Sequence, residues 1–468
     1  MANRTLHMVS LGCPKNLVDS EVMLGSLLET GYRVIDDPAK AALILVNTCA
    51  FIDASKKESV DAILEMAAQK ESGSCERLVV TGCLAQRYVD ALRHEIPEVD
   101  LWVGTGEFQN IAALVAEPPA DGVAVANPVY VYDSRVTRVN SRPAHSVYVK
   151  VSEGCGNPCT FCIIPKLRGD LRSRAISDIA AEVANLASRG MFEVNLIAQD
   201  LNAYGADRHD GTDLAKLLRA IARIDGVGWV RLHYLYPRPF PRDLLSAIAE
   251  EPRVAKYIDI PFQHISDRIL RAMKRGRGEK FHRELVEKLR AAIPRVSLRT
   301  SLIVGFPGET DRDFERLYDF VEEMRFDHVG VFEYSPEEGT PAGTMRRQVP
   351  ARVKAERRHR LLTLQRRLSR ERLAAYVGRE VDVLVDEVAE QARGRLESQA
   401  PEVDGHVVLR GSCRPGDLVR ARIASSGDYD LSAEVVQILQ PSRLASTSRT
   451  PATSAQIQLA SRALPVIG

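Results

Sequence analysis

The 468-residue sequence contains no run of about 18 apolar residues, the length that a membrane-spanning helix needs. It has no excess of either charge, because 63 Lys and Arg face 62 Asp and Glu, and a net charge of +1 gives no argument for nucleic-acid binding. The N-terminus lacks the charged start and apolar core of a secretory signal. With 45% hydrophobic and 27% charged residues, the chain is predicted to be a soluble, cytoplasmic protein of two to four domains without membrane partners.

Cysteine is scarce but unevenly placed, and three of the eight cysteines lie within eight residues. Cys155, Cys159 and Cys162 form the pattern C-x3-C-x2-C in the segment EGCGNPCTFCIIP, residues 153–165. In a large chain without signs of secretion, disulfides are disfavoured, and clustered cysteines indicate metal ligation or catalysis. Zinc sites and iron–sulfur clusters ordinarily take four protein ligands, so three thiolates would leave one metal position open for another chelator.

A second group of three cysteines is spread over the first 110 or so residues, where short apolar strands alternate with amphipathic helices. This alternation predicts βα units and a parallel sheet. Three of the predicted strands end at Cys13, Cys49 and Cys83, with 35 and 33 residues between them. The carboxyl ends of parallel strands meet at one edge, where ligands bind. Buried free thiols would explain one such cysteine, but three equivalent positions favour a second metal cluster with three protein ligands.

A second alternating region, about residues 145–338, follows a linker of Pro, Ala and Gly at residues 117–128. It contains six candidate strands with helical patterns between them, which indicates a barrel or partial barrel of six βα units. The functional site of such a barrel lies at the carboxyl ends of its strands, and Cys155 directly follows the first strand. Both groups of cysteines are therefore predicted at the carboxyl edge of a parallel sheet.

The rest of the chain comprises a basic helix, a small β region and a tail. Residues 351–373 carry nine Lys or Arg against two Glu along a stripe of Leu, which is typical of a helix that joins two domains or faces RNA. Residues 379–440 alternate at period two and predict a five-strand barrel with twelve Asp or Glu against seven Arg. The last 28 residues have little to bury and are predicted to be disordered.

Together these patterns predict an α/β fold class. An N-terminal open parallel α/β domain precedes a central partial (βα)6 barrel, which is followed by a small C-terminal β-barrel. The predicted domains are residues 5–128, 141–373 and 374–440, and the disordered tail is residues 441–468.

Cys155, Cys159 and Cys162 match the signature of the radical S-adenosylmethionine (SAM) superfamily. With the three-cysteine N-terminal domain and a C-terminal barrel that looks like a TRAM domain, the chain resembles the radical SAM methylthiotransferases over roughly residues 5–440. The resemblance implies two [4Fe–4S] clusters and SAM as cofactors. The Cys155 group would hold the cluster that cleaves SAM to a 5′-deoxyadenosyl radical, and the Cys13 group the cluster that carries the sulfur. A methyl group from another SAM would complete the change of C–H to C–S–CH3.

The motif GCPKN, residues 12–16, resembles the branch of this family that modifies an aspartate of small-subunit ribosomal protein twelve, whereas the tRNA branches typically have GCQMN. The acidic C-terminal barrel agrees, because an RNA-binding barrel should be basic, and an acidic one complements a basic ribosomal protein. The resemblance therefore implies 3-methylthioaspartate as product. The implied partners are the ribosomal protein or the assembling small subunit, an electron donor and a sulfur donor.

Two alternatives remain at this stage. A tRNA adenosine methylthiotransferase would use the same cysteines, and the basic helix at residues 351–373 favours it. A non-catalytic iron–sulfur carrier would need clusters whose coordination by the protein is closed.

Three segments of the central region resemble family segments near SAM, and no catalytic residue is predicted beyond the cluster ligands. Residues 193–205, 259–276 and 299–310 supply the implied cofactor contacts, which are Gln199, His264, Arg299, Ser301 and Gly305. A core position would explain His264 equally well, and a turn would explain Gly305. Lys15, Asn16 and Asp19, close to Cys13, are predicted to cap the following helix or to orient the first cluster, and capping is the ordinary role of Asn and Asp.

Overall fold

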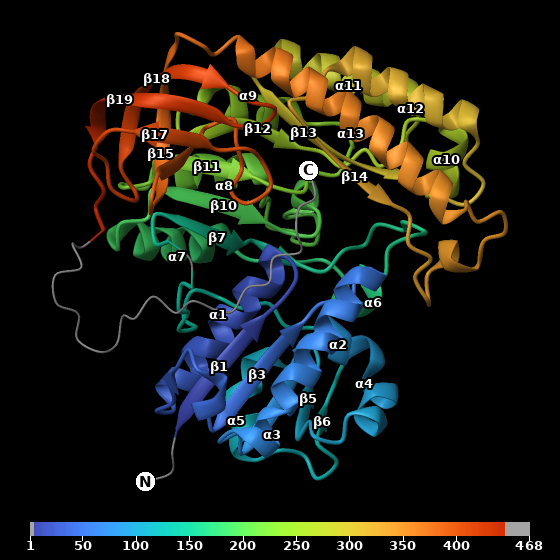
Figure 1. Cartoon of the computed structure of the whole chain (residues 1–468), viewed down its shortest axis with the longest axis vertical. Coiled ribbons are helices and arrows are strands. Elements are labelled where there is room, and N and C mark those ends of the chain that lie inside the picture. The colour runs from blue at the N-terminus through green and yellow to red at the C-terminus, as the bar shows by residue number, and fades with distance from the viewer. Residues whose placement is uncertain (1–3, 142, 445–468) are drawn as a thin grey trace.

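The computed structural model describes residues 4–141 and 143–444, and Figure 1 shows an N-terminal α/β unit below a second sheet and a small barrel. The first sheet is parallel throughout, with the strand order β2-β1-β3-β4-β5-β6. Its strands are β1 Thr5–Ser10, β2 Arg33–Val34, β3 Leu43–Thr48, β4 Arg77–Gly82, β5 Leu101–Val103 and β6 Val123–Ala124. Its helices are α1 Pro14–Glu29, α2 Asp53–Ala67, α3 Gln69–Ser72, α4 Cys83–Glu95 and α5 Ile111–Ala116.

The first sheet is covered on both faces, which explains why its central strands are almost continuously apolar. Every residue of β1 and β3 is buried. Val18 and Val22 of α1 pack on one face of the sheet, and Ile63 of α2 and Leu84 of α4 pack on the other. The carboxyl edge of this sheet points toward the second sheet (Figure 1).

The second sheet is the predicted partial barrel. Its six strands are all parallel in the order β14-β13-β12-β11-β10-β7, and the two edge strands do not pair with each other. They are β7 Ser146–Lys150, β10 Glu193–Ile197, β11 Trp229–Leu232, β12 Val254–Asp259, β13 Ser297–Val304 and β14 His328–Glu333. The helices of this region are α6 Ile164–Arg168, α7 Ile176–Ser188, α8 Leu214–Ala222, α9 Arg242–Glu250, α10 Asp267–Ala272, α11 Glu279–Ala292 and α12 Asp311–Met324. The predicted α/β fold class is thereby confirmed.

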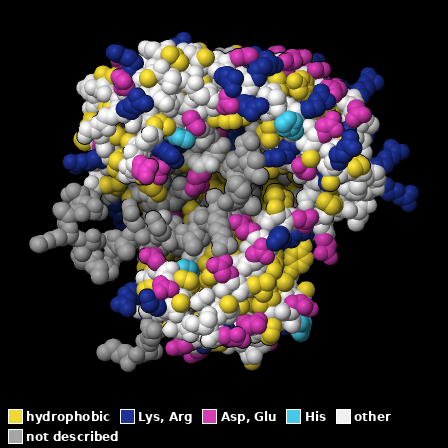
Figure 2. Space-filling view, in the orientation of Figure 1, with side chains coloured by type: hydrophobic (Ala, Val, Ile, Leu, Met, Phe, Trp, Pro, Cys, Tyr) yellow, Lys and Arg dark blue, Asp and Glu magenta, His cyan; other side chains and the backbone are white. Residues whose placement is uncertain are grey.

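The basic helix α13, Ala351–Ala374, packs on the partial barrel beside α12 and β14 (Figure 1). Leu361, Leu364 and Leu368 are buried in the core of the barrel. Several of its arginines pair with acidic residues of α12, as in Arg360–Glu315 at 2.7 Å. In Figure 2, cations and carboxylates are interspersed over this part of the surface.

The C-terminal region forms a closed five-strand barrel in the order β15-β16-β17-β19-β18. Its strands are β15 Glu380–Val388, β16 Ala392–Leu396, β17 Val407–Arg410, β18 Leu418–Ser426 and β19 Leu431–Gln440. Within the tail predicted to be disordered, Ser442 donates its backbone N–H to Asp417 at 2.7 Å, and residues 445–468 lie outside the described residues. No helix in residues 4–141 and 143–444 is both long and apolar enough to cross a membrane.

His282 gives the fold a specific sensitivity to pH. It is fully buried on α11 against Phe262, with 4.8 Å between ring centroids, and neither ring nitrogen has a hydrogen-bond partner among the described residues. Burial, followed by the charge of Arg275, lowers the pKa of His282 to about 3. The unfolded imidazole takes up a proton below about pH 6.5, whereas the buried one stays neutral, so stability falls as the pH drops from 6.5 toward 3.

We therefore expect His282→Leu to reduce the loss of unfolding free energy between pH 7.5 and pH 5 by about 2 kcal/mol. Urea denaturation at both pH values measures this difference. His94→Leu, at an exposed position on α4, is the control and should leave the difference unchanged. An equal pH dependence in the wild type and in His282→Leu would contradict the assignment.

Candidate functional site

Three cysteines meet at the carboxyl edge of the first sheet. Cys13 is the N-cap of α1, Cys49 directly follows β3, and Cys83 begins α4 directly after β4. Gly12 adopts φ +92°, and a Cβ atom there would lie 2.7 Å from Cβ of Cys49, so only glycine allows the two strand ends to approach so closely. Burial, then the nearby thiols of Cys83 and Cys13, raise the pKa of Cys49 to about 12. The predicted convergence of these cysteines is therefore observed.

The second group lies in the loop between β8, Ser152–Glu153, and β9, Arg172–Ser173, which pair as a short antiparallel ladder. Cys155 donates its backbone N–H to the carbonyl of Gly169 at 3.0 Å, which closes the base of the loop. Burial, followed by the neighbouring thiols of Cys159 and Cys155, raises the pKa of Cys162 to about 12. The loop thus holds its three thiols together at the carboxyl end of β7.

Three side chains that the sequence analysis missed donate N–H groups to these sulfurs. Asn157 contacts Sγ of Cys155 at 3.3 Å, Arg275 contacts Sγ of Cys159 at 3.5 Å, and Arg168 contacts Sγ of Cys83 at 3.6 Å. Donors of this kind stabilise thiolates and tune the potential of a bound cluster. Asn157 was recognisable by its place inside the cysteine motif, but the two arginines reach their sulfurs only through the tertiary fold.

The donor sets fit iron–sulfur clusters with three protein ligands. Thiolate-only ligand sets are typical of iron–sulfur clusters and of some zinc sites. Within residues 4–141 and 143–444, no three His, Cys, Asp or Glu side chains form a group of the kind that holds a single metal ion. In a [4Fe–4S] cluster each thiolate binds a different iron, so its ligands need a wider spacing than those of one ion.

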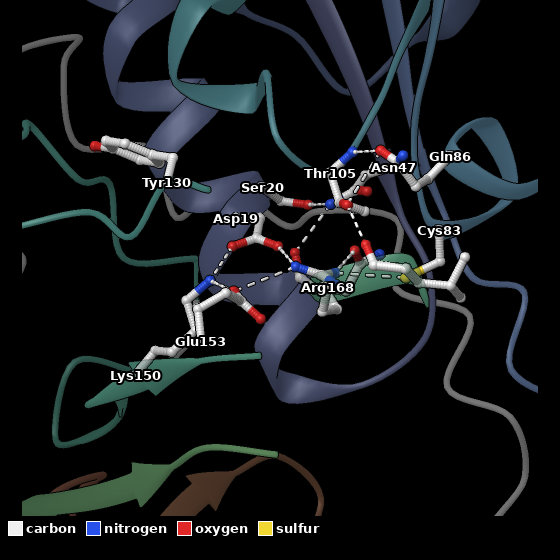
Figure 3. Close-up of polar contacts among 12 residues, drawn as sticks. Asp19, Ser20, Asn47, Cys83, Gln86, Thr105, Tyr130, Lys150, Glu153 and Arg168 are labelled. Atoms are coloured by element: carbon white, nitrogen blue, oxygen red, sulfur yellow. Dashed lines mark hydrogen bonds and ion pairs between the residues drawn. The ribbon is translucent and has the colours of Figure 1, made fainter. Parts of the chain in front are cut away.

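A buried charge network connects Cys83 of the first group with Glu153, two residues before Cys155, and Figure 3 shows its contacts. Lys150 of β7 bonds to Asp19 of α1 and to Glu153 of β8, both at 2.5 Å. Arg168, at the end of α6, bonds to Asp19 at 2.5 Å and to Glu153 at 3.4 Å. Burial alone would raise the pKa of Glu153, but Lys150 and Arg168 outweigh it and lower that pKa to about 2. Two cations and two carboxylates therefore compensate one another out of contact with water.

The predicted capping role of Asn16 and Asp19 is wrong. The N-cap of α1 is Cys13, and no side chain caps the helix. Asn16 instead donates to the carbonyls of Leu11 at 2.6 Å and Thr48 at 3.3 Å, and Asp19 is held in the buried network. Both side chains are buried at the contact with other elements, so tertiary partners replace the local cap.

The residues predicted to contact SAM lie in three places. Gln199, after β10, donates to the carboxylate of Glu153, beside the Cys155 group. Arg299 and Ser301 lie on β13, where Arg299 is 3.7 Å from Asp404. Burial alone would lower the pKa of Arg299. The nearby Tyr257, Asp259 and Asp404 outweigh burial, so the pKa of Arg299 is raised.

The other two predicted contacts meet at Glu309. Its carboxylate accepts the backbone N–H of Gly305 at 2.7 Å and lies 3.5 Å from Nε2 of His264. His264 also accepts two backbone N–H groups, from Ile265 and Ser266, at Nδ1. Its contacts are thus those of a buried turn, and all five cofactor contacts stay predictions.

Comparison with known proteins matches three parts of the chain to family models. Residues 5–104 match the uncharacterized protein family UPF0004, residues 149–321 the radical SAM superfamily, and residues 377–436 the TRAM domain. The chain is 53% identical to the ribosomal protein uS12 methylthiotransferase RimO of Anaeromyxobacter sp. (strain K), over 95% of this chain and 96% of that protein. It is 47% identical to the protein of the same name from Myxococcus xanthus (strain DK1622), over 95% and 94% of the two chains.

Among solved structures, the radical SAM methyltransferase TsrM from Kitasatospora setae, with a tryptophan substrate and a SAM analogue bound, has the same fold. Its TM-score is 0.54 at 18% identity, and the match covers 73% of this chain and 75% of that one.

The two glycines that flank Cys155 provide a matched test of the central cysteine loop. At Gly154, φ is +81° and an added Cβ would lie 1.9 Å from the carbonyl oxygen of Asp170, whereas an added Cβ at Gly156 meets nothing within 4 Å. We expect Gly154→Ala to lose about half of the bound iron, as one of two clusters is lost, and Gly156→Ala to retain it. Iron and sulfide analysis of the two purified variants measures this. Equal iron contents would contradict the geometry.

Proposed function

This chain belongs to the ribosomal protein uS12 methylthiotransferase family of radical SAM enzymes, and we propose that it converts the β-carbon C–H of an aspartate in uS12 to C–SCH3. The radical chemistry in the proposal rests on the arrangement of two cysteine triplets, and the choice of uS12 over tRNA rests on the 53% identity to the uS12 methylthiotransferase RimO of Anaeromyxobacter sp. (strain K). Each triplet lies at the carboxyl edge of its own parallel sheet, and one buried network joins them. The family uses SAM and [4Fe–4S] clusters as cofactors.

We assign a separate task to each triplet. Cys155, Cys159 and Cys162 would hold the cluster that supplies the chemistry for SAM cleavage, and Cys13, Cys49 and Cys83 would hold the cluster that supplies sulfur. When bound, the cofactors supply one-electron chemistry that removes a hydrogen atom from an unactivated carbon. The protein itself binds and orients the reactants and excludes water. Its N–H groups stabilise the thiolates. The candidate SAM contacts are Gln199, His264, Arg299, Ser301 and Gly305. The proposed domains are residues 5–128 with the first triplet, residues 141–373 with the second triplet, and residues 374–440 with the closed barrel.

Charge supports a protein substrate over tRNA. The C-terminal barrel has twelve Asp or Glu against seven Arg, which complements a basic ribosomal protein. On the basic helix α13, Arg360 and Arg367 are paired with carboxylates of α12, which offset their charge toward a phosphate backbone. The proposed partners are uS12, free or in the assembling small subunit, with an electron donor and a sulfur donor in the cytoplasm.

Mass spectrometry of both candidate substrates tests the proposal. The anaerobically reconstituted enzyme is incubated with SAM, sulfide and a reductant, together with small subunits or bulk tRNA. We expect a gain of about 46 Da, from SCH3 in place of H, on an aspartate of uS12. The same gain on a tRNA adenosine would mean that the family is correct and the substrate wrong.

The separate tasks of the two triplets predict different losses. Cys155→Ala should abolish SAM cleavage, because only the two thiolates of Cys159 and Cys162 would remain to hold that cluster. Cys13→Ala should leave SAM cleavage intact and stop methylthiolation of uS12. The assay counts 5′-deoxyadenosine and modified uS12 in the same reaction. If Cys13→Ala also stopped SAM cleavage, the assignment of tasks would be wrong.

A further inference from the structure

The short helix α6 is anchored to both cysteine sites. It begins two residues after Cys162, and Ile163 and Leu167 are buried in the core of the N-terminal sheet. The carbonyl of Leu167 accepts the hydroxyl of Thr105 at 2.5 Å, which ties α6 to the end of β5. Directly after α6, the carbonyl of Gly169 accepts the N–H of Cys155. The helix is therefore a rigid connection between the two triplets.

Arg168, the last residue of α6, uses its guanidinium to join the two sites (Figure 3). Nη2 is 3.1 Å from Oδ1 of Asn16 and 3.6 Å from Sγ of Cys83. Nη1 bonds to Asp19 and lies 3.4 Å from Glu153, two residues before Cys155. The side chain is 3% exposed, so its charge acts on Cys83 with little screening by water.

We propose that Arg168 is a positioning residue that sets the charge beside the Cys83 thiolate and holds the sulfur-carrying site at one place relative to the SAM-cleaving site. This inference rests on the proposed function, because it requires a cluster on Cys13, Cys49 and Cys83. Sulfur transfer to a substrate radical needs the two sites in a defined geometry, and small misplacements of reacting groups cost large factors in rate.

The positive charge of Arg168 should make reduction of the nearby cluster easier. Lys150 and Arg168 balance Asp19 and Glu153, so loss of the arginine leaves one carboxylate uncompensated beside a cluster ligand. An added negative charge opposes the gain of an electron, and the cluster becomes harder to reduce. Loss of the Asp19 charge must act in the opposite direction.

The test isolates the N-terminal cluster in full-length protein in which Cys155, Cys159 and Cys162 are all replaced by Ala. Iron analysis should find about four irons per chain, and a redox titration followed by electron paramagnetic resonance gives the reduced fraction. With Arg168→Met we expect the ratio of reduced to oxidised cluster at a fixed potential to fall about tenfold, which corresponds to about 59 mV. Arg168→Lys keeps the positive charge. It should therefore shift the reduction potential of the cluster by less than half as much as Arg168→Met does. Asp19→Asn should raise the ratio.

Arg138→Met is the matched control. Arg138 is also a nearly buried arginine that joins the two sheets, through Glu21 of α1 and Glu182 of α7, and its hydrogen bonds within the described residues go to no cysteine. It should lower stability without moving the potential. In the enzyme with both clusters, Arg168→Met should raise the number of SAM molecules cleaved per methylthiolated product at least tenfold, and Arg138→Met should not.

The possible outcomes distinguish a failure of the proposed function from a failure of the proposed role of Arg168. If the background variant binds no iron, the ligand assignment of the proposed function fails, and this inference fails with it. If iron is bound but Arg168→Met and Arg138→Met shift the potential alike, or Arg168→Met and Asp19→Asn shift it in the same direction, the proposed function stands and the role of Arg168 is overturned. Should Arg168→Met not fold, the Arg168→Lys and Asp19→Asn variants decide the question.

Discussion

Four buried charges decide how the two sheets lie against each other. Lys150 and Glu153 come from the start of the partial barrel, Arg168 from α6, and Asp19 from α1 of the first sheet, and none is more than 4% exposed. A buried ion deprived of its partner costs several kcal/mol, so a docking of the sheets that buried Asp19 away from Lys150 and Arg168 would be strongly disfavoured. The sheets therefore dock in the arrangement that pairs all four charges. That arrangement brings the carboxyl edges of both sheets, and so both cysteine triplets, to one place.

The small C-terminal barrel is attached at the opposite end of the second sheet. Glu193, the first residue of β10, binds Arg395 at 2.7 Å, and Ser297 and His328, the first residues of β13 and β14, contact the carbonyl of Ser398. The loop between β16 and β17 also brings Asp404 to the hydroxyl of Tyr257 at 2.8 Å. These contacts cover the amino ends of the barrel strands. The cysteines lie at the opposite, carboxyl ends of the strands. The same barrel carries the excess of acidic residues, so it combines a structural attachment with a surface suited to a basic protein.

Local patterns predicted much of the fold because they reflect local physics. The six strands of the partial barrel were recognisable as apolar runs between helical patterns, and the second sheet has six parallel strands within residues 145–338. The proximity of Cys13, Cys49 and Cys83 could be predicted because the carboxyl ends of parallel strands lie at one edge of the sheet. The same local reasoning failed for Asp19. Asp19 was predicted to cap the helix, but it lies in the second turn of α1 and faces a buried lysine from another sheet.

The order of residues was enough to establish the classes of the elements, the spacing of the two cysteine triplets and the chemistry that such thiols support. The charged groups that accompany the cysteines depend on how the sheets pack in space. Asp19 meets Lys150 and Arg168 across 131 and 149 residues, and Arg168 reaches Cys83 across 85. Contacts at such separations leave no period or motif in the chain, because they depend on how the sheets dock and not on the conformation of neighbouring residues. The basic stripe of α13 illustrates the same limit: its composition allowed RNA or a packed partner, and the fold placed α12 and its carboxylates there.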